Sequence, residues 1–492
     1  MKLLILVLNF LLLSASLNLI SCSQDKKESP KSDLNSVIKM SWALQAHDQA
    51  QIKVINQFGE PIASAQILIG SGVDTPFTGN LLVTDKAGAV SIPKDWSTEA
   101  HVTVDAAGFI RLTLLNQKPG DLTIRLAPLH LAQNAEIRGQ VTQLPVNNGD
   151  KLIDFGLVMP TLNRADLLSF DINEVISPYS DILSVAGQHQ PIPTNVSLPE
   201  QKENYFINLT ISKPLFRIQT PTKGPKRFYA ARGRFVFKTV VDEMRQGKPF
   251  YDQLNNFDLT GGGLREISVV NPVTNLDIPA NEIEFKGSMQ VQAVTGAVDE
   301  VMLLMAASQV ADSMIPTDIK KILTNQPMTL KTMTGKPSFV VSVLQKQSEF
   351  MTNLPGSDRM SAALVPYVAG LKPNLLPLIT NPQVAHRGAY AIRFPASPTK
   401  SGIYKIAQSI SLSNLVEVQN GDAKMLMAHP RWEIYGLGWN EQVQLPNWPL
   451  TNTTAKMRVG VSFIGSTKNV IPVLDDSLIE ATTHVSHAST DF

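Results

Sequence analysis

Hydrophobic and polar residues alternate along much of the chain between residues 51 and 126. Ile52 and Val54, for example, alternate with Gln51 and Lys53. Six or seven short runs of this kind predict half-buried strands, because successive side chains of a strand point to opposite faces. Turn-forming segments such as FGEP, DKAG and KPGD separate the runs. Two facing sheets bury such apolar rows economically, so the pattern predicts a small β-sandwich.

Short apolar runs continue to the C-terminus and are divided by loops that contain proline. The segment 298–314 also fits a helical spacing, but the many Pro and Gly residues around it favour a strand. The expected class is therefore all-β, with one or two further β-rich domains after the sandwich. We expect these further strands at residues 135–142, 206–211, 234–241, 283–294, 301–310, 338–344, 385–394, 406–418 and 457–464.

Three consecutive glycines at 261–263 interrupt this pattern. A phosphate-binding P-loop needs Lys and then Ser or Thr after its glycines, and neither follows here. We therefore expect a hinge or a tight turn at this point, and we place a domain boundary there. The expected domains are the sandwich at 50–128 and two β-rich domains at 129–260 and 264–492.

The N-terminus has a different pattern. Met1 and Lys2 precede an apolar run, residues 3–20, that several polar residues interrupt. This layout is typical of a secretory signal, whereas a spanning helix usually needs about 20 cleaner apolar residues. The run leads into the tetrapeptide LISC at 19–22, whose last residue, Cys22, is the only cysteine in the protein.

The tetrapeptide at 19–22 resembles the lipobox of bacterial lipoprotein signals, which reads Leu, a small or aliphatic residue, Gly, Ala or Ser, and then Cys. The resemblance implies that 1–21 is a signal peptide and that the Cys22 thiol receives diacylglycerol. Each buried methylene contributes roughly 0.8 kcal/mol, so several acyl chains such as palmitate anchor far more firmly than one. Ser23 lies where lipoproteins of the inner membrane often carry Asp, which favours the outer membrane of a bacterial cell envelope.

Residues 22–49 are expected to form the lipidated N-terminus and a flexible linker. The stretch SQDKKESPKSDLNS that follows Cys22 has a single leucine and many charged or polar residues. Such a segment buries too little apolar area to offset the entropy of ordering. The body is therefore expected to hang from the membrane by its lipid.

A set of residues in the predicted sandwich carries a family pattern: Val54, Gly59, Pro61, Ile62, Ala65, Ile67, Thr84, Asp85, Gly88, Ala107, Gly108 and Phe109. In these positions the chain resembles the carboxypeptidase regulatory-like family, which has a transthyretin-like or Ig-like fold. In zinc carboxypeptidases this module follows a catalytic domain with an H-x-x-E metal motif, and no His of this chain has Glu at that spacing. The resemblance thus implies a spacer or docking unit.

Composition narrows the possible partners. The chain of 492 residues has 43 basic and 42 acidic residues, a net charge of +1, so no field attracts nucleic acid. With Cys22 lipidated, the mature chain has no thiol for a disulfide, and packing alone must stabilise it. The expected partners are the membrane, through the lipid, and an envelope protein or glycan.

Three of the five tryptophans lie in the stretch RWEIYGLGWNEQVQLPNW near the C-terminus. Exposed aromatic rings pack well on the apolar faces of sugars, so Trp432, Tyr435, Trp439 and Trp448 are a candidate glycan-binding patch. The alternative is core packing, because Trp432 and Ile434 share one face of a strand.

Catalytic and metal motifs are weak throughout. The run GVSFIG at 460–465 has one residue too many for the hydrolase elbow G-x-S-x-G and no strand-to-helix turn, so we do not expect Ser462 to be a nucleophile. His484 and His487 would point to opposite faces of a strand, and we interpret them as residues of the tail. The sequence predicts no catalytic residue, no metal site and no cofactor.

The function expected from these patterns is a membrane-anchored envelope lipoprotein that binds a partner or has a structural role without catalysing a reaction. The alternative is an envelope hydrolase whose site in the C-terminal half leaves no local motif. A structural subunit of a surface or secretion assembly is a third hypothesis.

Overall fold

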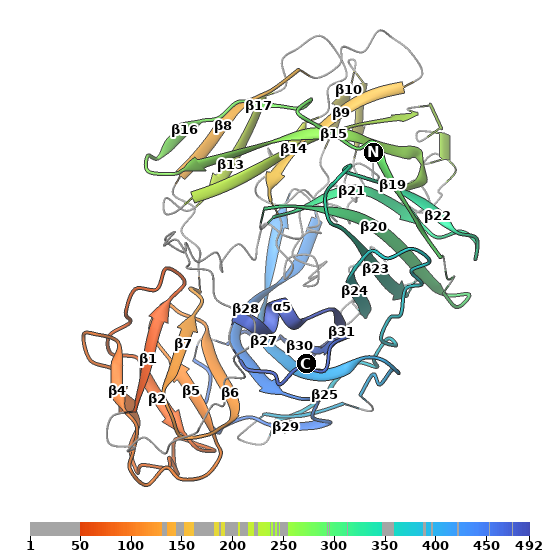
Figure 1. Ribbon diagram of the computed structural model, residues 1–492. Coiled ribbons are helices and arrows are strands. Elements are labelled where there is room, and N and C mark those ends of the chain that lie inside the picture. The colour runs from red at the N-terminus through yellow and green to blue at the C-terminus, as the bar shows by residue number, and fades with distance from the viewer. Residues whose placement is uncertain are drawn as a thin grey trace, which may run out of the picture.

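The structure is a computed structural model, and its described elements are nearly all strands (Figure 1). This confirms the all-β class. The signal peptide, Cys22 and the linker up to residue 49 lie outside the described residues. The structure describes residues 50–129, 135–143, 152–161, 182–185, 188–191, 205–206, 215–220, 225–236, 238–239, 242–243, 246, 254–292, 294, 296–311, 313–346, 359–386, 390–394, 397–420, 423–451, 453–474 and 476–492.

The N-terminal unit is the predicted sandwich. Its strands are β1 (Gln51–Asn56), β2 (Gln66–Ile69), β3 (Leu82–Val83), β4 (Ala89–Ser91), β5 (Ala100–Asp105), β6 (Arg111–Gln117) and β7 (Leu122–Leu126). One sheet has the order β4-β1-β7, and β3-β2-β5-β6 form the other. Ile52 and Val54 from the first sheet meet Val102 and Val104 from the second in one buried core. The alternating pattern of the sequence therefore identified the inward rows correctly.

The second sheet of the sandwich does not end at β6. It continues through β28 (Ala423–Leu437), β27 (Tyr404–Asn420), β30 (Met457–Ser466), β31 (His484–Asp491), β24 (Met360–Pro366), β23 (Ser338–Lys346), β20 (Glu300–Val310) and β21 (Ser313–Lys321). β6 and β28 are parallel, with Arg111 opposite Trp432 and Leu114 opposite Tyr435. The result is one sheet of twelve strands. Where the sequence suggested separate domains, the sandwich and the C-terminal strands share a sheet (Figure 1).

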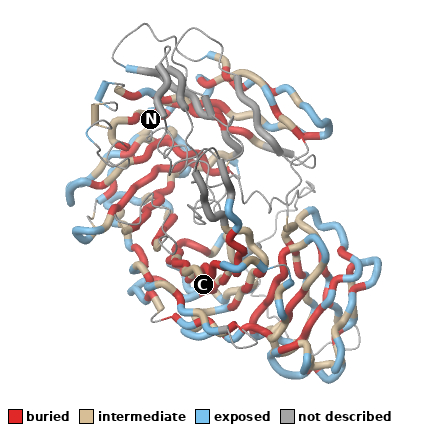
Figure 2. The backbone as a smooth tube through the Cα atoms, turned by 180° about the vertical axis from the view of Figure 1, so that it is seen from behind, coloured by how far each residue is buried: buried red, intermediate tan, exposed pale blue. Residues whose placement is uncertain are grey.

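One face of the C-terminal strands is a fixed apolar core. Ile434 of β28, Ile410 of β27 and Val461 of β30 lie in it, fully or almost fully buried. A small sheet of β25 (Gln383–His386), β26 (Tyr390–Arg393) and β29 (Gln442–Gln444) covers this face through Ile392 and Val443. Figure 2 shows the buried stretches running along the strands of both units, with exposed turns at the periphery. Among the described residues, this face of the strands is thus taken up by packing.

A middle unit precedes the C-terminal strands. A sheet with the order β12-β9-β14-β15-β18 and a sheet with the order β13-β8-β16 contribute to a common core. Its strands are β8 (Ala135–Thr142), β9 (Leu152–Pro160), β10 (Ile182–Val185), β11 (Gln188–Pro191), β12 (Tyr205–Phe206), β13 (Leu215–Thr220), β14 (Pro225–Val236), β15 (Phe257–Ser268), β16 (Val273–Asn275), β17 (Ile278–Pro279) and β18 (Ile283–Glu284). The strand expected at 135–142 is present with those bounds.

The interpretation of the three glycines as a hinge or turn was wrong. Gly261, Gly262 and Gly263 lie inside β15 and pair with β14, so the boundary placed there falls within a continuous strand. Glycine is needed because other backbone comes very close: a Cβ on Gly263 would lie 1.8 Å from the carbonyl oxygen of Pro279, and one on Gly261 2.1 Å from that of Ile283. The sequence signal was real, but it marked close packing of strands.

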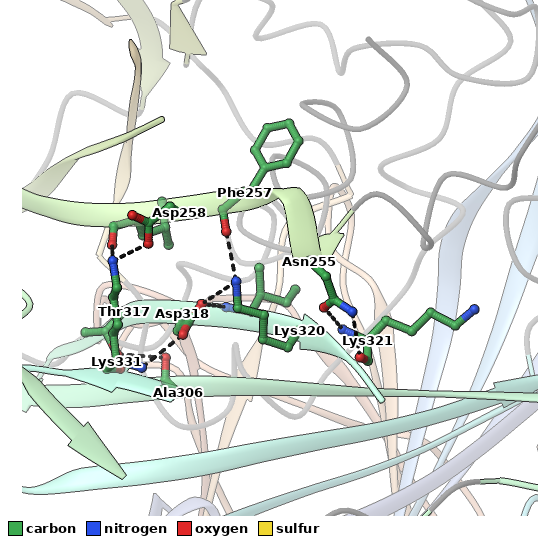
Figure 3. A network of polar contacts seen from close by, with 11 residues as sticks. Asn255, Phe257, Asp258, Ala306, Thr317, Asp318, Lys320, Lys321 and Lys331 are labelled. Atoms are coloured by element: carbon green, nitrogen blue, oxygen red, sulfur yellow. Dashed lines mark hydrogen bonds and ion pairs between the residues drawn. The ribbon is translucent and has the colours of Figure 1, made fainter. Parts of the chain in front are cut away.

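A polar network joins the middle unit to β21 and to β22 (Met328–Thr332), which pairs with β19 (Gly287–Val291) (Figure 3). Asp318 is buried and accepts hydrogen bonds from the backbone N–H groups of Ile319 and Lys331, each 2.9 Å long. The Lys320 ammonium donates to the Phe257 carbonyl of β15 at 2.9 Å, and the Lys331 ammonium contacts Asp258. Burial raises the pKa of Asp318, and Lys320 partly opposes this shift. The middle unit is thus fixed by polar contacts.

A glycine-to-alanine pair tests the close approach in β15. Gly263→Ala is expected to lower the free energy of unfolding by about 2–3 kcal/mol, because the new methyl group displaces the Pro279 backbone. Gly120→Ala, at a turn with nothing within 4 Å of the new atom, is expected to change it by less than about 0.5 kcal/mol. Urea unfolding of the two variants measures both values, and equal stabilities would contradict the packing role.

Candidate functional site

The four aromatic residues of the candidate glycan patch do not form one exposed platform. Trp432 is 0% exposed, and its indole N–H donates to the Thr113 hydroxyl at 2.8 Å. Its ring belongs to the core between the large sheet and the small one. For Trp432 the prediction of glycan contact is wrong, and the core-packing alternative is correct.

Trp448 holds the sandwich to the C-terminal strands. The guanidinium of Arg111 lies between two indole rings, 5.0 Å from the centroid of Trp432 and 4.6 Å from that of Trp448. It also donates to the Trp448 carbonyl at 2.6 Å and to Asp105 at 2.9 Å. Arg111 is only 3% exposed, so these partners replace the water that its charge has lost. Trp448 is therefore part of a structural joint.

Trp439 and Tyr435 also take separate places. Trp439 packs edge-to-face on Phe463, and its indole N–H donates to the Ile464 carbonyl at 2.8 Å. Tyr435 packs against the sandwich core from the opposite face of β28. Of the four candidates, only Tyr435 lies on the sheet face away from the core of Trp432.

That second face carries the candidate site. Strand registers align two rows of mostly polar side chains across four strands, and we call this surface the polar face. Its first row is Tyr435 of β28, Ser409 of β27, Ser462 of β30 and His487 of β31; its second row is Glu433, Ser411, Gly460 and Ser489 of the same strands. Most of these residues are partly exposed, although Gly460 and Ser489 are buried.

Ser462 and His487 are directly opposite each other and in contact. The Ser462 Oγ and His487 Nδ1 atoms are 2.9 Å apart, a hydrogen-bonding distance. A Cβ on Gly460 would lie 2.8 Å from Ser411 Oγ and 3.2 Å from His487 Cε1. The missing side chain at Gly460 thus lets a second hydroxyl and the imidazole converge beside Ser462.

Glu433 and Tyr435 form the other end of the polar face, beside the sandwich. The Tyr435 hydroxyl donates to Glu433 Oε2 at 3.2 Å. Glu433 keeps part of its surface exposed, yet the protein surrounds its carboxylate closely enough that burial raises its pKa, with the Tyr435 hydrogen bond opposing the shift. The charge of Glu433, burial and this hydrogen bond together raise the pKa of Tyr435 well above its ordinary value. The Tyr435 hydroxyl therefore keeps its proton and remains a hydrogen-bond donor to Glu433.

An ion pair borders the polar face on its far side. The Arg458 guanidinium donates to Asp491 at 2.6 and 3.2 Å, and both side chains are largely buried. Arg458 lies two residues before Gly460 on β30, and its partner Asp491 lies two residues after Ser489 on β31. Their charges compensate each other, so this border adds no net charge.

His484 and His487 lie on opposite faces of β31, as expected for a strand, but they are not residues of a loose tail. His484 is 1% exposed. Its Nε2–H donates to the Asn374 carbonyl at 2.6 Å, and its Nδ1 therefore accepts from the Thr483 hydroxyl at 2.7 Å. Burial lowers the pKa of His484 to about 4, and the bond to Asn374 partly opposes this. The two histidines cannot bind one metal ion together.

The polar face is better suited to binding than to acyl transfer. A hydrolase needs hydrogen-bond donors aimed at the developing oxyanion, and these are often backbone N–H groups at a sharp turn. Ser462 instead lies in the middle of β30 between two paired strands, where the backbone is engaged in the ladder. Within the described part of the chain, no cluster of three or more His, Cys, Asp and Glu side chains is placed to hold a metal ion.

No sequence pattern links Ser462 to His487. They are 25 residues apart, and the register of β30 with β31 alone brings them together. Ser409 and Ser411 alternate with apolar residues in the strand predicted at 406–418, and Ser462 does so in the strand predicted at 457–464, but this alternation does not say which strands pair. Such alternation indicates strands with one apolar and one polar face.

Known proteins provide no match from which a function could be inferred. No protein-family model matches the chain, and no curated protein matches it significantly. Within the described residues, no helix is both long enough and apolar enough to cross a membrane.

The buried His484 predicts a specific pH dependence. The unfolded chain binds a proton near the ordinary pKa of 6.5, whereas the folded chain binds it only near pH 4, so stability falls as the pH drops through this window. The loss reaches about 2–3 kcal/mol by pH 4.5. His484→Gln should lack this part of the pH dependence. Urea unfolding at pH 7 and pH 4.5 gives the change in the free energy of unfolding between the two pH values. An equal change in the parent and in His484→Gln would contradict the neutral, buried imidazole.

Proposed function

We propose that this protein is a lipid-anchored lipoprotein of the bacterial envelope, placed in the outer membrane, whose β-structure binds a partner without catalysing a reaction. The support for the anchor is the position of the only cysteine, directly after an apolar leader and in the tetrapeptide LISC. Acyl chains on Cys22 and the polar linker after it would hold the body at the membrane surface.

The observation that carries the binding role is the polar face. Hydroxyl, imidazole and carboxyl groups stand in two aligned rows on β28, β27, β30 and β31. The opposite face of the same strands is packed into a buried core, so the rows have little freedom to rearrange. A preorganised polar surface loses little conformational entropy when it binds.

The sandwich has a supporting role in this proposal. Its resemblance to the carboxypeptidase regulatory-like family favours a non-catalytic module. Here β6 extends the sheet that carries the polar face, and Arg111 fastens the two parts. We therefore assign to it the task of holding the β28 end of the polar face in place.

Substitution of Cys22 tests the anchor. Cys22→Ala should remove fatty-acid labelling and release the protein from the membrane fraction, because the thiol is the attachment atom. Ser23→Ala is the matched control and should stay labelled and membrane-bound, while Ser23→Asp should shift the protein to the inner membrane. Fractionation with metabolic palmitate labelling measures all three, and an unlabelled parent protein in the cytosol would overturn the proposal.

A hydrolase is the second candidate function, and one observation favours it: the hydrogen bond between Ser462 and His487. If Ser462 were an activated nucleophile, a fluorophosphonate probe would label it, and Ser462→Ala and His487→Gln would both abolish labelling. We expect no labelling, because the mid-strand position offers no oxyanion site. Mass spectrometry of the probe-treated protein decides between the two functions.

A further inference from the structure

The chemistry of the polar face limits what it can bind. Ser409, Ser411 and Ser462 each offer a hydroxyl, which both donates and accepts hydrogen bonds. His487 contacts the Ser462 hydroxyl through Nδ1, and the other nitrogen of its ring is a donor or an acceptor according to the tautomer. Such two-way groups match a ligand whose own groups both donate and accept, and hydroxyl groups are of this kind.

The charges of the polar face also favour a ligand with hydroxyl groups. Glu433 is the one carboxylate in the two rows, and burial beside Tyr435 disfavours its ionised form. The bordering Arg458 and Asp491 are bound to each other. Among the described residues of the two rows there is no guanidinium or ammonium group for an anion, and Glu433, the one carboxylate, already accepts a hydrogen bond from Tyr435.

The spacing of the rows favours an extended ligand. Neighbouring strands lie about 4.8 Å apart, and residues two positions apart along a strand are about 6.8 Å apart. Polar groups therefore recur both across the four strands, within each row, and along each strand, from one row to the other. Gly460 brings Ser411 and the His487 ring together beside Ser462, so the donors and acceptors are densest there.

From these observations we infer that the polar face binds an uncharged, polyhydroxylated chain, a neutral oligosaccharide, across strands β28, β27, β30 and β31. The inference rests on the proposed binding function and names its ligand class. It also moves the carbohydrate site from the indole rings of Trp432, Trp439 and Trp448, which are engaged in packing, to the opposite face of the same sheet.

Matched oligosaccharides test the ligand class. The full-length lipoprotein, solubilised in a detergent without a sugar headgroup, is titrated with the neutral pentamers of N-acetylglucosamine and of glucose. The cationic, deacetylated pentamer of the first and an anionic pentagalacturonate serve as charged counterparts. Saturation-transfer NMR and calorimetry should show binding of at least one neutral pentamer and weaker binding of both charged ones.

Variants place the site. Ser462→Ala and His487→Gln should each weaken binding of the neutral pentamer by about 3- to 10-fold, the effect of one lost hydrogen bond. Ser409→Ala, on the neighbouring strand β27, should weaken binding to a similar extent. It takes the place of Ser462→Ala or His487→Gln if one of these two variants does not fold. Thr123→Ala, on an exposed position of β7, should bind like the parent. Thermal unfolding of each variant separates lost contacts from lost structure.

The inference is overturned if neither neutral pentamer binds, if a charged counterpart binds as tightly, or if folded variants of the polar face bind like the parent. None of these results affects fatty-acid labelling at Cys22 or the absence of fluorophosphonate labelling. Failure of the ligand class is therefore distinguishable from failure of the anchor and of the non-catalytic role.

Discussion

The guanidinium of Arg111, enclosed by two indole rings, is the contact on which the arrangement of this protein depends. A buried positive charge is tolerated only where other groups replace its water, and Arg111 has Asp105, two carbonyl groups and the faces of Trp432 and Trp448. These partners come from both the sandwich and the C-terminal stretch. The parallel pairing of β6 with β28 is thereby held in one register, and the sandwich becomes part of the twelve-stranded sheet.

That register decides which side chains face the core. Trp432 and Ile434 point to the apolar side, and Glu433 and Tyr435 point to the polar face. A slip of one residue would exchange the two sets, since side chains alternate along a strand. The packed tryptophans of the C-terminal stretch, Trp432, Trp439 and Trp448, thus have a positional role. They fix the sheet so that the residues between them and on the neighbouring strands form the polar face.

Local patterns predicted part of this structure, and long-range pairing determined the rest. The sandwich strands and the strand at 135–142 follow from alternation over a few residues, and the β20 strand follows from the Pro and Gly residues around its apolar run. The meaning of Gly261–Gly263 depended on a carbonyl group of Pro279 that only the folded middle unit brings near. Likewise, Ser462 meets His487 through a strand register, and Trp448 meets Arg111 across more than 300 residues. A single sequence contains no local signal for such encounters.

The junction between β6 and β28 also constrains the order of assembly. Arg111 contacts a residue 337 positions further along the chain, so this edge of the sandwich is completed only when nearly the whole polypeptide is available. Contacts between residues so distant in sequence slow folding, because a long loop must close first. The sandwich lies in the first third of the chain, so the edge of β6 has no partner strand until the residues of β28 are available. Such an edge can pair with strands of other chains, so the folding chain is prone to aggregation until β28 covers β6.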